Sequence, residues 1–186
     1  MARGRGAFLL ALAVVATAAS AHAQPVPLGT EFVVNSYTTG TQFNPEVAAD
    51  PMGNFVVVWS SYDGSGLGAV GQRYASSGIP LGSEFRVNTY TTSNQFLPCV
   101  AADPFGNFVV VWSSYTQDGS GLGVFGQRYA SSGTPLGPEF RVNTYTSSVQ
   151  AVRSLAADSA GNFVIVWESM LQDGSGWGVF GQRYAA

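Results

Sequence analysis

The sequence predicts an all-β protein, built from three four-stranded antiparallel meander repeats in a propeller-like arrangement. The first observation is an internal repeat, because Trp59, Trp112 and Trp167 stand at the same place in three similar phrases, and such self-similarity indicates a repeat architecture. The second is composition: 23 glycines among 186 residues accompany abundant Val, Phe, Tyr, Ser and Thr, which favour strands and turns. The third is that no long stretch after residue 23 has the apolar spacing of a helix.

Residues 1–23 are predicted to be a secretory signal peptide and not part of the fold. Arg3 and Arg5 precede an apolar run over 7–19, and Ala-His-Ala at 21–23 offers a small-x-small cleavage site, the combination that marks an exported protein. We therefore expect a secreted, periplasmic or cell-surface protein that keeps no membrane span after cleavage. An uncleaved anchor is the alternative.

Residues 24–186 are expected to form one repeat domain, with units at 27–79, 80–134 and 135–186. The later two units each carry two extra residues just before a shared Asp-Gly-Ser-Gly (DGSG) phrase. An even insertion keeps the following side chains on their original faces of a strand. The loop is thus predicted to have grown without disturbing the sheet.

Each unit is predicted to contain four strands, as the second unit illustrates. "EFRVN" (84–88) alternates polar and apolar residues, as a strand with one wet face does, and "PCVAAD" (98–103) is a short second strand. "FVVVWSS" (108–114) is apolar on both faces, which is typical of a buried central strand. After the DGSG loop, "GVFGQRYA" (123–130) is the fourth strand. The "DPFGN" phrase between the second and third strands suits a tight turn.

The order of the strands bears on how the units assemble. The domain opens with a spare "EF" strand at 31–35, and its last unit closes with the "GQRY" strand at 181–184. A first strand that completes the last sheet is how a ring of blades closes and hides its edges. Since closed propellers use about 4–8 blades, we predict a homodimer completing a six-bladed ring. The alternatives are an open arc of three blades and a threefold β-prism or trefoil-like barrel.

Three phrases give each unit a recognisable signature: "AAD-x-x-GNFVVVW", then "QDGSG-x-GVFGQRY", then "SSG-x-PLG-x-EFRVN". In these phrases the chain resembles a repeat of large exported and surface proteins of bacteria, and the resemblance covers essentially all of 27–186. It implies a propeller-type blade of four strands, and it implies little chemistry. The small number of copies, three, is where this chain departs from the family.

Several catalytic classes are excluded by composition. The chain has no lysine, one histidine (His22, inside the predicted signal peptide) and one cysteine (Cys99). No Ser–His–Asp triad, Cys–His pair, Schiff-base lysine or histidine-containing zinc site can be built from the mature chain. A formal net charge of −3 gives no electrostatic footprint for nucleic acid. Cys99 is expected to be a buried thiol acting as a small hydrophobe.

The repeated polar residues have mainly structural interpretations. Asp50, Asp103 and Asp158 open the predicted tight turns and are expected to cap them. Arg73, with its counterparts in the other units, is expected to pair with a carboxylate of a neighbouring unit, or alternatively to clamp a ligand. The DGSG oxygens suit Ca²⁺, but one acid per loop favours an Asx-type turn, so we expect no cofactor and keep Ca²⁺ as the alternative.

Aromatic residues beside the DGSG loops are the best indication of function. Trp177 replaces a leucine that the first two units carry at the same place, and two tyrosines stand directly before the loops. Exposed aromatic rings beside hydroxyl and carboxylate groups suit sugars, and flat aromatic surfaces also bind proteins. The candidate ligand-binding residues are Tyr62, Asp63, Tyr115, Asp118, Asp173 and Trp177.

The sequence therefore favours a secreted, non-enzymatic binding module that binds carbohydrate at the rim formed by the DGSG loops. Its expected partner is a glycan or, alternatively, a surface protein. A purely structural repeat protein, with assembly as its only property, is the alternative. A glycoside hydrolase is more distant. Such enzymes work with paired carboxylates, and the only acids not repeated between units are Glu46 and Glu168.

Overall fold

The computed structural model describes residues 25–62, 64 and 66–186, so the predicted signal peptide at 1–23 and Asp63 lie outside the described residues. All the strands belong to the compact unit Val33–Ala186, which is described here by itself. Within the described part of the chain, no helix is long and apolar enough to cross a membrane.

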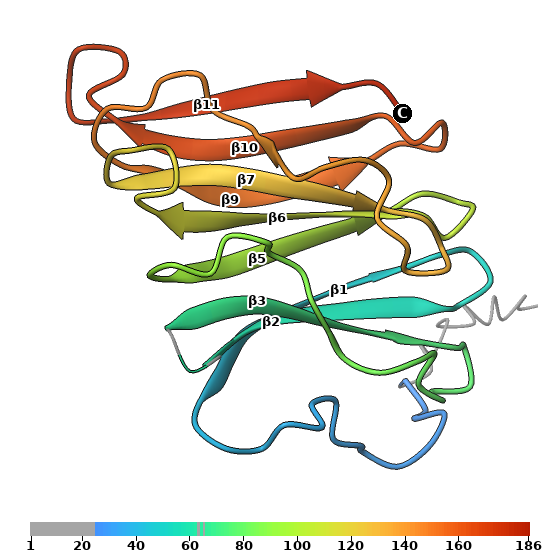
Figure 1. Ribbon diagram of the computed structural model, residues 1–186. Helices are drawn as coiled ribbons and strands as arrows, with labels where there is room; N and C mark the ends of the chain where they lie inside the picture. Colours follow the sequence, from blue (N-terminus) through green and yellow to red (C-terminus); the bar gives the residue numbers. More distant parts are fainter. Residues whose placement is uncertain (1–24, 63, 65) are drawn as a thin grey trace, which may run out of the picture. The chain divides into compact units, whose positions relative to one another are not determined.

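The strands form three antiparallel sheets in series (Figure 1). Sheet 1 is ordered β1 (Gln42–Ala49), β2 (Phe55–Tyr62), β3 (Leu67–Tyr74) and β4 (Phe85–Arg86). Sheet 2 is ordered β5 (Gln95–Ala102), β6 (Phe108–Tyr115), β7 (Leu122–Tyr129) and β8 (Phe140–Arg141). Sheet 3 contains β9 (Gln150–Ala157), β10 (Phe163–Met170) and β11 (Trp177–Tyr184), with β10 in the centre. The all-β prediction is confirmed, and the three sheets are consistent with a propeller-like fold.

The central strand of each sheet is the apolar phrase that the sequence singled out. In β6, Val110 and Trp112 are completely buried, on the face toward sheet 1, and Val111 is completely buried on the opposite face, toward sheet 3. A strand with apolar side chains on both faces must be covered on both. The core therefore consists of two layers, one on each face of sheet 2.

The predicted tight turns are confirmed in all three units. In the turn between β5 and β6, Asp103 Oδ1 accepts hydrogen bonds from the backbone N–H groups of Phe105 (2.8 Å) and Asn107 (2.9 Å), and Oδ2 accepts one from the Asn107 side chain (2.8 Å). Gly106 has φ 78°, a conformation that glycine adopts without steric cost. The Asp50 and Asp158 turns repeat these bonds.

A bulge in β5 joins sheet 1 to sheet 2. The pairing of β5 with β6 shifts between Phe96 and Cys99, and Leu97 there has φ 54°. This distortion turns the Leu97 N–H toward sheet 1, where it donates to Ser60 Oγ at 3.2 Å. Val152 N–H makes the corresponding bond to Ser113 Oγ of sheet 2 at 3.1 Å. A buried serine thus links each sheet to the inner strand of the next.

The outermost strand of each four-stranded sheet comes from the following unit. Phe85 and Arg86 pair with Gly71 and Val70 of β3, so the "EFRVN" phrase finishes the preceding sheet and does not begin its own. Only two of its residues form a strand, which is shorter than predicted. The predicted four strands per unit are present in 80–134 and 135–186. Unit 27–79 has three, because the strand predicted at 31–35 is not formed there. Sheet 3 has three strands, in keeping with a last unit that has no following "EF" phrase to complete its sheet.

The sheets pack face to face in chain order. Val56, Val58 and Ala69 of sheet 1 meet Phe108 and Trp112 of sheet 2 in one buried cluster. A second cluster joins the other face of sheet 2 to sheet 3 through the residues Val109, Val111, Val124, Phe163, Ile165 and Trp167. Within Val33–Ala186 the strands therefore form three separate packed sheets and not a single closed barrel.

Candidate functional site

The DGSG loops connect the second and third strands of each sheet, at the end of the sheets drawn on the left in Figure 1. In the loop between β6 and β7, Thr116 N–H donates to the Gly121 carbonyl at 2.7 Å, and Gly119 N–H donates to the Thr116 carbonyl at 3.0 Å. The inserted Thr116 has φ 61°, so the two extra residues of this unit allow the loop to close on itself. Backbone groups of the loop therefore form hydrogen bonds with one another, which stabilises its conformation.

Asp118 holds its loop against the sheet. Its Oδ1 accepts from Ser120 N–H at 3.3 Å, as expected of an Asx-type turn, and its Oδ2 accepts from the Asn143 side chain at 3.3 Å. The carboxylate lies over Gly123, where an added Cβ atom would come within 2.5 Å of Oδ2. Both carboxylate oxygens of Asp118 therefore hold the loop in place, and these are the same oxygens that would accept hydrogen bonds from a ligand.

Asp173 is the exposed counterpart of Asp118. Its Oδ1 accepts from Ser175 N–H at 3.2 Å, and its carboxylate lies over Gly178. No described side chain donates to Asp173 Oδ2 in the way that Asn143 donates to Asp118. The third acid of the predicted set, Asp63, lies outside the described residues.

The three predicted aromatic residues lie at the ends of the strands that carry the loops. Tyr62 is 55% exposed, Tyr115 45% and Trp177 54%. Tyr62 is the last residue of β2, Tyr115 the last of β6, and Trp177 the first of β11, where it pairs with Met170. The structure thus places one exposed ring beside the loop of each sheet, which brings each ring to its own loop but not the three rings to one cavity.

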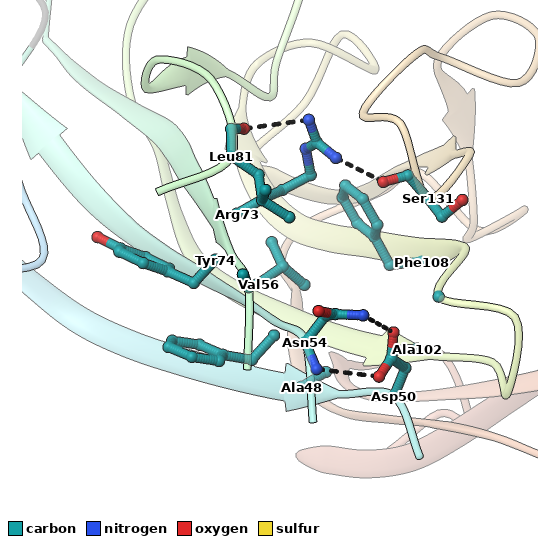
Figure 2. A pocket seen from close by; sticks show the side chains of 13 residues that line it. Ala48, Asp50, Asn54, Val56, Arg73, Tyr74, Leu81, Ala102, Phe108 and Ser131 are labelled. Atoms are coloured by element: carbon teal, nitrogen blue, oxygen red, sulfur yellow. Dashed lines mark hydrogen bonds between the residues drawn. The ribbon is translucent and has the colours of Figure 1, made fainter. Parts of the chain in front are cut away.

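A pocket of about 140 Å³ lies between sheets 1 and 2, away from the DGSG loops (Figure 2). The Arg73 guanidinium spans it, donating to the Leu81 carbonyl at 3.1 Å and to the Ser131 carbonyl of the next unit. The prediction that Arg73 pairs with a carboxylate is wrong, because the turns facing it present backbone carbonyls. Sequence reasoning missed these acceptors, since every residue type carries one.

The glutamates of the "EF" phrase also bind backbone and amide donors. Glu139 Oε2 accepts from the backbone N–H of Thr89 at 2.8 Å and from its hydroxyl at 3.0 Å, and Oε1 accepts from Gln117. Glu84 accepts from Ser36 N–H in the same way. Each carboxylate therefore links its own "EF" phrase to the residue directly after the "EF" phrase of the preceding unit.

The two non-repeated acids lie on different sheets. Glu168, on β10, forms an ion pair with Arg153 of β9 at the surface, whereas Glu46 lies on β1. Among the described residues, no three His, Cys, Asp or Glu side chains gather closely enough to hold a metal ion. Burial raises the pKa of the Cys99 thiol to about 11, with a smaller contribution from Glu46.

Comparison with known proteins gives a likeness of fold. No protein-family model and no curated protein matches the chain. A protein of unknown function from Dyadobacter fermentans DSM 18053 is similar with a TM-score of 0.53 and 12% identity, covering 75% of this chain and 36% of that one. The Hadza microbial sialidase Hz136 is similar with a TM-score of 0.51 and 9% identity, covering 74% of this chain and 37% of that one. The chain thus spans little more than a third of the length of these structures.

Proposed function

We propose that the protein is an exported, non-enzymatic binding module, and that it holds carbohydrate at the rim formed by the DGSG loops. The observation that supports this best is the exposure of one aromatic ring beside each loop: Tyr62, Tyr115 and Trp177. Large rings are ordinarily buried because they contribute much apolar area. Three rings left in water at equivalent ends of three sheets favour a surface that stacks on a ligand.

The loops supply the polar part of the same surface. The carboxylate of Asp118 is engaged within its loop. Ser120 Oγ accepts from Ser148 N–H at 3.2 Å, so the Ser120 hydroxyl keeps its proton to donate to a sugar hydroxyl. Apolar stacking with a few fixed polar groups is the usual composition of a small-molecule site. Three such places on one chain would also raise the avidity for a repeating glycan.

The comparisons add limited support. One similar structure, with a TM-score of 0.51, is named a sialidase, which is in keeping with a carbohydrate ligand but carries no catalytic residue over to this chain. We propose a binding role because Glu168 is engaged by Arg153 and Glu46 lies on another sheet, so the two non-repeated acids do not form a pair.

The test is a glycan array followed by calorimetry on the best ligand, with the Trp177→Leu variant beside the wild-type protein. Leucine is what the other two units carry at this place, so the substitution preserves the strand and removes only the ring. Loss of a stacking ring should weaken binding by about tenfold. A matched Val164→Ala variant on the same sheet, away from the loops, should bind normally.

Two results would overturn the proposal. One is an array with no binding to any glycan. The other is turnover of chromogenic glycosides that disappears in Glu168→Gln, which would make the protein an enzyme. Edman sequencing of the exported protein tests the localisation, since we expect its first residue to be Gln24.

A further inference from the structure

The outer edge of β11 is open, although the same edge of β3 and β7 is covered. Val179 of β11 is 80% exposed, whereas its counterparts Ala69 and Val124 are completely buried. All three stand at one register position, since their partners on the central strands are Glu168, Ser60 and Ser113. An unpaired, apolar strand edge is a ready template for another segment of chain.

Sheets 1 and 2 show what such an edge binds. In sheet 2, Val124 N–H donates to Asn143 Oδ1 at 2.7 Å, and the Val124 carbonyl accepts from Val142 N–H at 2.8 Å. In sheet 1, Ala69 makes the same two bonds with Asn88 and Val87, both at 2.8 Å. By its register, Val179 directs the same N–H and carbonyl to the open edge.

The shape of the edge is also specific. An added Cβ atom on Gly126 would come within 2.7 Å of the Phe140 ring, and on Gly71 within 2.8 Å of the Phe85 ring. At the equivalent Gly181, the nearest atom is Val166 Cγ1 at 3.3 Å. The glycine of β11 therefore leaves the same recess, with no described phenylalanine over it.

A glutamine repeated in the three units completes the comparison within the chain. Gln127 Nε2 donates to the Gly137 carbonyl at 2.9 Å, and Gln72 Nε2 to the Gly82 carbonyl at 3.1 Å. Gln182 of β11 donates only to its neighbour, the Arg183 carbonyl, at 3.0 Å. A glycine carbonyl is the acceptor that this edge lacks among the described residues.

The chain carries a third copy of the segment that covers these edges. Residues 27–35 read "PLGTEFVVN", where 80–88 read "PLGSEFRVN" and 135–143 read "PLGPEFRVN". Tyr74 donates its hydroxyl to the Val34 carbonyl at 2.7 Å, as Tyr129 does to the Val87 carbonyl at 3.1 Å. Val34 therefore contacts sheet 1 as Val87 contacts sheet 2.

The asparagine of this third copy, Asn35, has a side-chain oxygen that can accept a further hydrogen bond. Asn35 Nδ2 donates to the Tyr37 carbonyl at 2.8 Å, the bond that Asn88 makes with Tyr90 and Asn143 with Tyr145. Its Oδ1, however, receives no hydrogen bond from any described residue. The Oδ1 atoms of the other two asparagines each accept one, from β3 in sheet 1 and from β7 in sheet 2.

We infer that the open edge of β11 binds residues 27–35 of a second copy of this chain. Phe32 of that copy would fill the recess over Gly181, and its Asn35 Oδ1 would accept from Val179 N–H. Its Gly29 carbonyl would accept from Gln182 Nε2. Equivalent residues make each of these contacts in sheets 1 and 2. The proposed partner segment is therefore defined by its hydrogen bonds as well as by its shape.

Two chains joined reciprocally in this way form a closed ring of six sheets. The contact joins the start of one chain to the end of another, and such head-to-tail contacts form a ring when the rotation closes and a filament when it does not. Six sheets fall within the usual range for closed propellers, about 4–8. Twofold closure covers the outer edge of β11 in both chains.

The proposal is tested by the mass of the assembly in light scattering and sedimentation. Wild-type protein should have twice the mass of one chain. Gly181→Ala should halve it, because the added methyl group occupies the place of the Phe32 ring, while Val166 needs to yield only a few tenths of an ångström. Phe32→Ala should halve it from the other side of the contact.

Controls separate loss of assembly from loss of fold. Gly181→Ala should keep the circular dichroism spectrum of the wild type, and Trp177→Leu should weaken glycan binding without a change of mass. A wild-type protein that stays a single chain at high micromolar concentration would overturn the inference. So would an assembly whose mass is unchanged in both Gly181→Ala and Phe32→Ala.

Discussion

The ring of Phe140 lies over Gly126 so closely that a Cβ atom added to Gly126 would come within 2.7 Å of its Cζ atom. The two residues face each other across β7 and β8, and the contact recurs between Phe85 and Gly71. A glycine on the third strand thus leaves room for the phenylalanine ring that anchors each outer strand. This contact matters because an outer strand of two residues forms few backbone hydrogen bonds with its neighbour.

Replacing that glycine should destabilise the fold. Gly126→Ala forces the Phe140 ring off β7, and overpacking of this kind costs about 1–3 kcal/mol. Denaturant unfolding should show the loss as a lower midpoint with an unchanged slope. Gly181→Ala, at the same place in sheet 3 and measured at low protein concentration, should leave the midpoint nearly unchanged; an equal loss would refute the explanation.

Asn143 should be among the most sensitive polar positions. It is buried, accepts from Val124 N–H and donates to the Tyr145 carbonyl and to Gln150 Oε1. Asn143→Ala leaves the Val124 donor buried without a partner, which costs about 1–3 kcal/mol. Thermal or denaturant unfolding of dilute protein measures this. Asn35→Ala is the matched control and should cost clearly less, because Asn35 Oδ1 has no described donor.

Tyr129 should ionise only in strongly alkaline solution. Its hydroxyl donates to the Val87 carbonyl at 3.1 Å, and desolvation, with the nearby Glu139 charge, raises its pKa well above the ordinary value. A raised folded pKa means that the neutral phenol favours the fold, so the stability it gives is present at neutral pH and is lost as the pH rises through that pKa. Ultraviolet titration should show this late ionisation.

The Tyr129→Phe variant isolates the hydroxyl from the ring. The ring stacks on Phe108 with centroids 4.9 Å apart, and phenylalanine keeps that contact. The variant should therefore lose only the hydrogen bond, about 0.5–1.5 kcal/mol, together with the late ionisation. A loss as large as that of Tyr129→Leu would show that the hydroxyl contributes more than this single bond.

Cys99 should react slowly with alkylating reagents in the folded protein. Burial, with a smaller contribution from Glu46 and with Arg153 opposing the rise, brings its pKa to about 11, so the reactive thiolate is scarce at pH 8. Glu46→Gln should speed alkylation and Arg153→Gln should slow it, with the unfolded chain faster than all of them. Equal rates in the two variants would contradict this electrostatic account.

Much of the fold could be predicted because its determinants are local. Three features follow from a few neighbouring residues each: the Asp103 turn, the central strand that carries Trp112, and the even insertion before Asp118. Their hydrogen bonds and burial are those that turn chemistry and two-sided apolar patterning predict.

The remaining features depend on contacts between units. The spare "EF" strand indicates that this phrase completes another sheet, but the recess over Gly71 and Gly126 that holds the phenylalanine ring could not be predicted from the phrase itself. The Arg73 partner is a backbone carbonyl of Ser131, and no residue type in the sequence marks it. Trp177 is exposed, as predicted, although it is the first residue of β11 and not part of the loop. The internal role of Asp118 depends on Asn143 in the next unit.

The exchange of outer strands between units has a consequence for folding. β4 and β8 lie on the stretch of chain that goes on to build the following sheet, so neither of the first two units, cut at its sequence boundaries, contains its complete sheet. Loss of sheet 2 would remove the anchor of β4 and expose the third strand of sheet 1. We expect the three sheets to melt in a single cooperative transition and not one by one, in contrast to repeat arrays whose units touch only through their surfaces.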